Sequence, residues 1–250
     1  MIKNELKLIL AAISFFTRIS FSSNHIKNID EETLQKSARY FTLIGILIGA
    51  VQALVFWGSS FLYSKQLSIL FSMIATILLT GGFHEDGFAD CCDGFGGGFT
   101  RYKILSIMKD SRVGAFGAIG ICLILATKFF AIYEIPSDKI PAIIILGHII
   151  SRLSAISLVY IYPYVRDEAA SKSNPVVKYF TGKDLCIAGI ISIIPFFIIG
   201  NLTTFFALIP VFIFTFLLGY YFMKTIGGIT GDCLGATQQV TEVIFYLQSI

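Results

Sequence analysis

The residues best suited to chemistry are three aspartates in the segment TGGFHEDGFADCCDG, residues 80–94. Asp86, Asp90 and Asp93 stand at positions i, i+4 and i+7, and at about 100° per residue these positions share one narrow face of a helix. Three carboxylates so close together repel one another unless a cation lies between them. Because oxygen-only ligands suit Mg²⁺ or Mn²⁺, the spacing favours a divalent metal site over a solvated acidic turn.

Two further polar segments accompany these aspartates. In KDSRVG, residues 109–114, Lys109 and Arg112 could hold a diphosphate, Arg112 by a two-pronged contact, although Lys109 could equally anchor the next apolar run. In GGITGDCLGA, residues 227–236, a glycine-rich backbone leads into a helix and can present N–H groups to phosphate. Asp232 in this segment could add a fourth carboxylate to the metal site.

The elements that position these segments must lie in lipid. The sequence is 55% hydrophobic and 14% charged, with a mean hydropathy of +0.78, whereas soluble domains carry about 25% charged residues. Apolar runs of about 20 residues cross a bilayer, and their backbone groups must be satisfied within helices. We therefore expect an all-α, polytopic helical bundle. The predicted spans are residues 38–63, 67–83, 113–135, 140–164, 185–202 and 205–223.

Both ends of the sequence predict further helices. Residues 3–16 combine a basic flank with a short apolar stretch and favour a retained amphipathic or half-buried helix. Residues 240–250 are apolar and predict a seventh helix that begins earlier, near Asp232. Because no repeat or composition break divides the chain, residues 1–250 are expected to form a single membrane domain.

The distribution of basic residues gives the expected orientation. With a cytoplasmic N-terminus, the inner segments 1–37, 84–112, 165–184 and 224–239 and their edges hold fifteen Lys or Arg residues, against two in the outer loops. This positive-inside asymmetry places the polar segments on the cytoplasmic face. The net charge of +3 and the absence of a basic cluster interleaved with aromatics give no support to nucleic-acid binding.

Two charged residues fall inside predicted spans, where charge is costly and usually faces a partner or a cavity. For Arg152, a functional role and a structural one, in which its side chain extends to the inner membrane surface, are weighted equally. His148, one turn earlier, is expected to be a buried hydrogen-bonding group. Lys128 lies deeper and should pair with a carboxylate, although the sequence does not identify which one.

The three polar segments, in this order and between hydrophobic runs, resemble the adenosylcobinamide-GDP ribazoletransferase (cobalamin 5′-phosphate synthase) family. Weaker matches at residues 15–20, 43–50, 151–152 and 164–166 extend the resemblance over most of the chain. The resemblance implies a magnesium-dependent enzyme of the bacterial cytoplasmic membrane, with its active site facing the cytoplasm. Such an enzyme joins adenosylcobinamide-GDP to α-ribazole, or to α-ribazole 5′-phosphate, and releases GMP. A homo-oligomer or contacts with other late cobalamin-pathway enzymes would fit the same resemblance.

The resemblance also implies residue roles. The residues expected to hold the metal and catalyse the reaction are Asp86, Asp90, Asp93 and Asp232, with Asp90 expected as the general base. The residues expected to bind substrate phosphates are Arg18, Lys109, Asp110, Arg112, Arg152, Arg166, Gly228, Thr230 and Gly231. The sequence departs from the family pattern at Glu85, where an apolar residue is usual, and at Gln239, where an acidic residue is common.

Two alternatives belong to other classes of membrane protein. A CDP-alcohol phosphotransferase would carry D-x₂-D-G-x₂-A-R followed by D-x₃-D, but no arginine follows Ala89. A transporter would place its carboxylates near mid-span and show internal repeat symmetry, whereas these aspartates cluster at the end of a span. Both alternatives therefore rank below the transferase.

Overall fold

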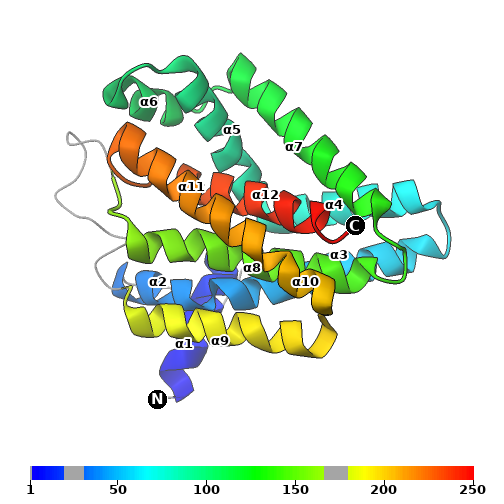
Figure 1. Ribbon diagram of the computed structural model, residues 1–250. Coiled ribbons are helices and arrows are strands. Elements are labelled where there is room, and N and C mark those ends of the chain that lie inside the picture. The colour runs from blue at the N-terminus through cyan, green and yellow to red at the C-terminus, as the bar shows by residue number, and fades with distance from the viewer. Residues whose placement is uncertain (1, 20–30, 166–179) are drawn as a thin grey trace.

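The computed structural model describes residues 2–19, 31–165 and 180–250 (Figure 1). Within these ranges the regular structure is helical apart from an isolated β-bridge between Tyr164 and Ile229, so the all-α prediction is confirmed. The helices are α1 (Ile2–Phe16), α2 (Glu31–Ser37), η1 (Ala38–Tyr40), α3 (Phe41–Ser60), α4 (Lys65–Thr80), α5 (Phe83–Gly97), α6 (Arg101–Met108), α7 (Ala115–Glu134), α8 (Ile140–Ile161), α9 (Gly182–Ile199), α10 (Leu202–Phe206), α11 (Leu208–Ile226) and α12 (Gly231–Leu247).

The membrane-spanning part of the described chain is formed by five helices that are long and apolar enough to cross a bilayer. They are Glu32–Ser60, Ala115–Glu134, Ile140–Ile161, Gly182–Ile199 and Leu202–Ile226. Helices α4 and α5 make a sixth span only if they are counted together as one bent pair. The chain is therefore a multi-pass membrane protein. The last helix begins at Gly231, as expected from the sequence, but its 17 residues leave it outside this set.

The predicted span 67–83 is wrong at its end. Helix α4 stops at Thr80, the chain bends by 88°, and α5 begins at Phe83. Gly81 and Gly82 make this bend because both have positive φ angles, of 73° and 72°, which glycine adopts without the steric penalty of a side chain. The bend turns the helix that carries the aspartates away from the α3–α4 hairpin.

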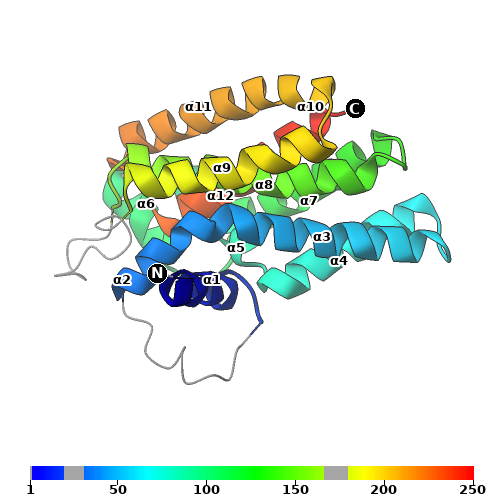
Figure 2. The same cartoon turned by 90° about the horizontal axis from the view of Figure 1, so that it is seen from below.

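Helix α8 lies at the centre of the bundle, between α3 and α12 (Figures 1 and 2). Small residues allow this close packing: a Cβ atom on Gly45 would lie 2.6 Å from the backbone oxygen of His148, and one on Gly49 would lie 2.8 Å from the Cα of Ile145. Close approach of backbones through glycine is how membrane helices gain contact area. Helices α3, α8 and α12 are thus closely packed, and α5 is held against them through its contacts with α12.

Helix α1 lies beside α2 at one side of the bundle (Figure 2). Leu8, Ala11 and Ala12 are buried, whereas Leu6 and Phe15 are exposed. This division into two faces agrees with the predicted amphipathic or half-buried N-terminal helix.

Candidate active site

Four aspartates are brought together where α5 crosses α12. Along α5, Asp86 is exposed, Asp90 is half-buried and Asp93 is buried. A Cβ atom on Gly87 would lie 3.0 Å from the Cα of Asp232, so the absent side chain lets the first turn of α12 approach α5 closely. The crossing therefore brings Asp232 near the aspartates of α5, and its expected role as a fourth metal ligand stays a prediction.

The first turn of α12 is fixed by its own cap. Thr230 Oγ1 accepts a hydrogen bond from the Cys233 N–H at 3.2 Å, and its hydroxyl donates to Asp232 Oδ2 at 3.4 Å. Gly228 precedes this cap with φ at 155°, and a Cβ there would collide with the carbonyl oxygen of Pro163. A threonine cap and a glycine loop thus hold Asp232 at the helix N-terminus, where a negative charge is stabilised.

Two of these carboxylates have a raised pKa. Burial, followed by the charges of Asp232, Asp86 and Asp93, raises the pKa of Asp90 to about 7. Burial and the charge of Asp86 raise the pKa of Asp232 to about 6, against an opposing hydrogen bond from Thr230. A cation bound among these carboxylates would supply positive charge that reduces their mutual repulsion.

The donor set fits an ion that keeps part of its shell for other ligands. Within the described residues, no three His, Cys, Asp or Glu side chains converge closely enough to hold a metal ion alone. Mg²⁺ is usually bound by one or two carboxylates, with waters and substrate phosphates completing an octahedron. The residues present therefore fit Mg²⁺ bound together with a phosphorylated substrate.

The raised pKa values make the stability of the metal-free protein depend on pH. Asp has an ordinary pKa of about 3.9, so between about pH 4 and pH 7 the folded protein binds more protons at Asp90 and Asp232 than the unfolded chain. Stability in EDTA should therefore fall as the pH rises through this window. Thermal unfolding of wild type and Asp90→Asn tests this: the variant should gain in Tm over wild type as the pH rises. A difference in Tm that does not change with pH would contradict the expectation.

Asp93 has two backbone partners that set it apart from the other aspartates. Its Oδ2 accepts the N–H of Gly114 at 2.7 Å, and its Oδ1 accepts the N–H of Gly117 at 2.8 Å. A Cβ on either glycine would collide with the carboxylate. Asp93 therefore caps the N-terminus of α7 and ties the segment 109–114 to α5; its predicted role as a metal ligand stays a prediction.

Asp93→Asn is expected to lower the stability of the protein by ~1–2 kcal/mol. The amide offers one acceptor oxygen, and its NH₂ group cannot accept the second backbone N–H. The thermal unfolding midpoint in detergent measures the effect, with Asp138→Asn in the exposed loop before α8 as the matched control. Equal midpoints for the two variants would show that the cap contributes nothing.

A cavity of about 190 Å³ adjoins Asp232; it is called the polar cavity below because Lys109 and Asp232 line it together with apolar residues. Its lining brings Lys109, Thr230 and Gly231, three of the predicted phosphate-binding residues, to the same place as this aspartate. The other lining residues are Leu105, Met108, Tyr164 and Val165. The cavity is thus bounded by α6, by the loop before α12 and by the chain after α8.

Asp110 and Arg112 pair with each other at the surface. Arg112 Nη2 lies 2.6 Å from Asp110 Oδ2, and its Nε donates to Oδ1 at 3.0 Å. The Arg112 side chain is 87% exposed. The hydrogen bonds from Arg112 lower the pKa of Asp110 to about 2. Both residues therefore lie at the protein surface, and Arg112 can bind a phosphate only after its ion pair with Asp110 is broken.

The other predicted phosphate-binding residues are spread out. Arg18 lies over the bend between α4 and α5, since a Cβ on Gly81 would stand 2.6 Å from its Nε. Arg166 lies outside the described residues. The sequence analysis assigned no role to Arg101, yet its Nη1 would stand 3.5 Å from a Cβ on Gly227. In the sequence, the only indication of a role for Arg101 was its position in the first turn of the helix that follows the glycine-rich segment 94–98.

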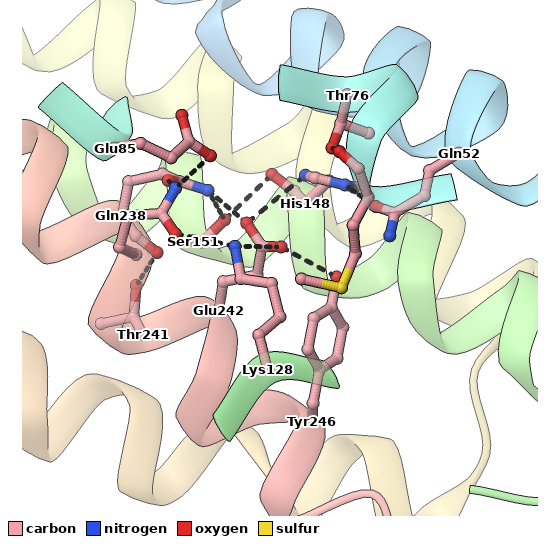
Figure 3. Close-up of polar contacts among 12 residues, drawn as sticks. Gln52, Thr76, Glu85, Lys128, His148, Ser151, Gln238, Thr241, Glu242 and Tyr246 are labelled. Atoms are coloured by element: carbon pink, nitrogen blue, oxygen red, sulfur yellow. Dashed lines mark hydrogen bonds and ion pairs between the residues drawn. The ribbon is translucent and has the colours of Figure 1, made fainter. Parts of the chain in front are cut away.

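A buried polar network lies between α5, α7, α8 and α12 (Figure 3). Glu242 Oε1 lies 3.2 Å from Lys128 Nζ and accepts the Tyr246 hydroxyl at 3.1 Å. Lys128 also donates to Gln239 Oε1 at 2.7 Å. Lys128 was expected to have a carboxylate partner, and the structure identifies it as Glu242. The sequence separation of these residues explains why spacing alone could not find the pair.

Arg152 belongs to the edge of this network. It is 1% exposed, its Nη1 hydrogen-bonds to Nδ1 and to the carbonyl oxygen of His148, both at 3.0 Å, and its guanidinium stacks over Phe41. Its Nε has no partner among the described residues. The structure thus places Arg152 with His148, which is buried and hydrogen-bonded as expected, in a small cavity that Glu85 of α5 and Gln238 of α12 also line. The predicted phosphate-binding role of Arg152 stays a prediction.

The two departures from the family pattern contact each other. Gln239 Nε2 donates to Glu85 Oε1 at 3.0 Å. A negative charge on α5 therefore stands next to the position on α12 where the resemblance led us to expect an acidic residue. This pairing keeps an acidic group near Lys128, which also bonds Gln239.

Comparison with known proteins gives consistent matches over the whole chain. The family model described as Cobalamin-5-phosphate synthase matches residues 8–250. A protein of Shewanella frigidimarina named adenosylcobinamide-GDP ribazoletransferase is 42% identical over 247 residues, covering 97% of this chain and 94% of that protein. Proteins of the same name from Ralstonia pickettii and Vibrio parahaemolyticus are 40% and 37% identical, covering 93% and 100% of this chain and 91% and 94% of their own lengths. No solved structure matches the chain.

Proposed function

Since the chain belongs to the cobalamin-5-phosphate synthase family, we propose that it transfers adenosylcobinamide phosphate from adenosylcobinamide-GDP to α-ribazole, or to α-ribazole 5′-phosphate, and releases GMP. The observation that carries this proposal is the α5–α12 crossing, which brings Asp232, a lining residue of the polar cavity, near Asp86 and Asp90. The family matches support the identity of the substrates, and the crossing supports the site of the chemistry.

The reaction breaks one phosphoanhydride bond and forms one phosphoester bond. The acceptor hydroxyl attacks the phosphorus on the cobinamide side of the diphosphate, the bond to the bridging oxygen breaks, and GMP leaves with that oxygen. Asp90 takes the hydroxyl proton, because it is half-buried in the middle of the cluster. Phosphoryl transfer otherwise depends on positioning and charge neutralisation, which Lys109, Thr230 and the first N–H groups of α12 provide around the cavity.

One or two carboxylates of the group Asp86, Asp90 and Asp232 would hold Mg²⁺, or Mn²⁺ in its place, together with the substrate phosphates. When bound, the ion neutralises the diphosphate and stabilises the charge that develops on the leaving phosphate. Asp93 is the least suited of the four aspartates, because each of its oxygens already accepts a backbone N–H. Its capping bonds instead fix α7 and the loop that carries Lys109 against α5.

We also place the protein in the bacterial cytoplasmic membrane with the aspartates facing the cytoplasm. The positive-inside distribution of Lys and Arg supports this orientation. A cytoplasmic site also suits a GDP-activated donor, which is charged and water-soluble at one end. Association with a second copy or with other late cobalamin-pathway enzymes remains a prediction from the resemblance.

The test is GMP release by purified protein in nanodiscs, supplied with adenosylcobinamide-GDP, α-ribazole and Mg²⁺. We expect GMP to appear, to require both substrates, to stop on addition of EDTA and to resume with excess Mg²⁺. A folded protein that releases no GMP with α-ribazole or its 5′-phosphate would refute the proposal. CDP-alcohol donors with lipid alcohols would then be tested, since that class is the enzymatic alternative.

A further inference from the structure

A second cavity, mostly apolar and about 220 Å³ in volume, lies next to the polar one. Residues of α1, α2, η1, α3, α5, α8 and α12 line it. Tyr164 and Gly231 line both cavities, so the two are neighbours separated by one side chain and one stretch of backbone. A ligand that filled the apolar cavity would therefore reach the aspartates by passing these two residues.

The size of the apolar cavity selects among the parts of the proposed substrates. A cavity of about 150 Å³ in another protein binds benzene, and sites for drug-sized ligands occupy about 300–1,000 Å³. At about 220 Å³ the cavity suits one flat bicyclic ring system. It is too small for a corrinoid.

The wall of the cavity is built for an aromatic ring. Phe16 and Phe41 stack with their centroids 4.3 Å apart, and Phe41 and His84 stack at 5.6 Å with an interplanar angle of 21°. Ala38 and Ala155 also line the cavity, with small side chains. Stacked rings favour a flat aromatic ligand over a flexible chain.

Two polar groups in this apolar wall lack partners among the residues that the structure describes. They are both amide atoms of Gln35 and the Nε2 atom of His84, and each side chain is only 3% exposed. A buried polar group without a hydrogen bond costs about 1–3 kcal/mol, which a ligand with its own hydrogen-bonding atoms would relieve. A lipid acyl chain would leave both groups unsatisfied.

We propose that this cavity binds the nitrogen-heterocyclic base of the acceptor nucleoside, an inference that rests on the proposed function. The base stacks in the apolar cavity, and the Gln35 amide or His84 Nε2 donates to its ring nitrogen. The ribose then extends past Gly231 and Tyr164 into the polar cavity, where its hydroxyl meets the aspartates. The donor diphosphate approaches from the other side, so each substrate has its own compartment.

Gln35→Leu and Ala155→Phe test this assignment in the GMP-release assay. The first removes the polar contact at nearly constant size, and the second fills the cavity. We expect the KM for α-ribazole to rise roughly tenfold or more, with less than a twofold change in the KM for adenosylcobinamide-GDP. Gln66→Leu, at an exposed position on α4 whose amide bonds Tyr133, is the matched control and should change neither KM.

A binding measurement separates failure of this inference from failure of the proposed function. Benzimidazole alone should bind wild-type protein in nanodiscs, in equilibrium dialysis without donor, and should bind Ala155→Phe at least tenfold more weakly. If the wild type releases no GMP, the proposed function is refuted, and benzimidazole binding still tests whether the apolar cavity binds a heterocyclic base. The inference would be overturned if the wild type is active but Gln35→Leu and Ala155→Phe have the same KM for α-ribazole as the control. It would also be overturned if these variants raise the KM values for both substrates equally. Benzimidazole binding that Ala155→Phe leaves unchanged would also overturn it.

Discussion

Replacing Asp90 with asparagine should reduce the rate of GMP release by about 10²–10⁴-fold, the usual contribution of a general base. The side chain keeps its size, but its amide can neither take the acceptor proton nor carry the negative charge. The charges of Asp232, Asp86 and Asp93 all raise the pKa of Asp90. We therefore expect no neighbouring carboxylate to replace Asp90 as the proton acceptor. Single-turnover GMP release at saturating substrates and Mg²⁺ measures the chemical step.

Two comparisons make this result specific. Asp138→Asn changes an exposed aspartate in the loop before α8, away from the α5–α12 crossing, and should retain the wild-type rate within about twofold. Asp90→Asn should also remain folded in EDTA at neutral pH, because it removes one of the mutually repelling charges. A rate for Asp90→Asn above about one-tenth of wild type would exclude Asp90 as the base.

The largest effect on stability is expected from Lys128→Met. Lys128 and Glu242 form an ion pair whose side chains are 6% and 1% exposed, and removal of one partner leaves the other charge buried. The expected loss is ~3–5 kcal/mol. Thermal unfolding in nanodiscs should show a much lower midpoint, and the effect should change little with salt because water and ions do not reach the pair.

A double variant shows whether the loss comes from the orphaned charge. Lys128→Met combined with Glu242→Gln should be less destabilised than the sum of the single variants, since contacting residues are not additive. Lys139→Met, at an exposed loop lysine, is the matched control and should lie within about 0.5 kcal/mol of wild type. Additive losses would mean that the pair contributes no coupling energy.

Much of the fold could be predicted because lipid imposes a simple rule on each apolar run. The runs at 140–164 and 205–223 predicted helices that the structure confirms as α8 and α11, with ends a few residues away. The bend after Thr80 could not be predicted in this way, since hydrophobicity continues to Phe83. The two left-handed glycines that cause it are a backbone property that hydropathy does not register.

The site was predictable where its residues are close in sequence. The spacing of Asp86, Asp90 and Asp93 defined one helix face, but both hydrogen bonds that occupy Asp93 come from residues 114 and 117 on another helix. The partner of Lys128 lies on α12, and Gln35 meets the cavity from α2. Contacts of this kind arise from helix packing, which periodicity within one segment cannot reveal.

The bend between α4 and α5 also has a consequence for the surrounding lipid. Helix α4 has 16 residues, and at about 1.5 Å per residue it is about 24 Å long, shorter than a hydrocarbon core of about 30 Å. Because α4 counts toward a span only together with α5, the bend at its end either lies recessed below the headgroups or is met by local thinning of the bilayer. In either case the hydrophobic mismatch at α4 shortens the path from the aqueous phase to the aspartates. An amphiphilic corrinoid could then keep its apolar edge against lipid while its diphosphate enters the site.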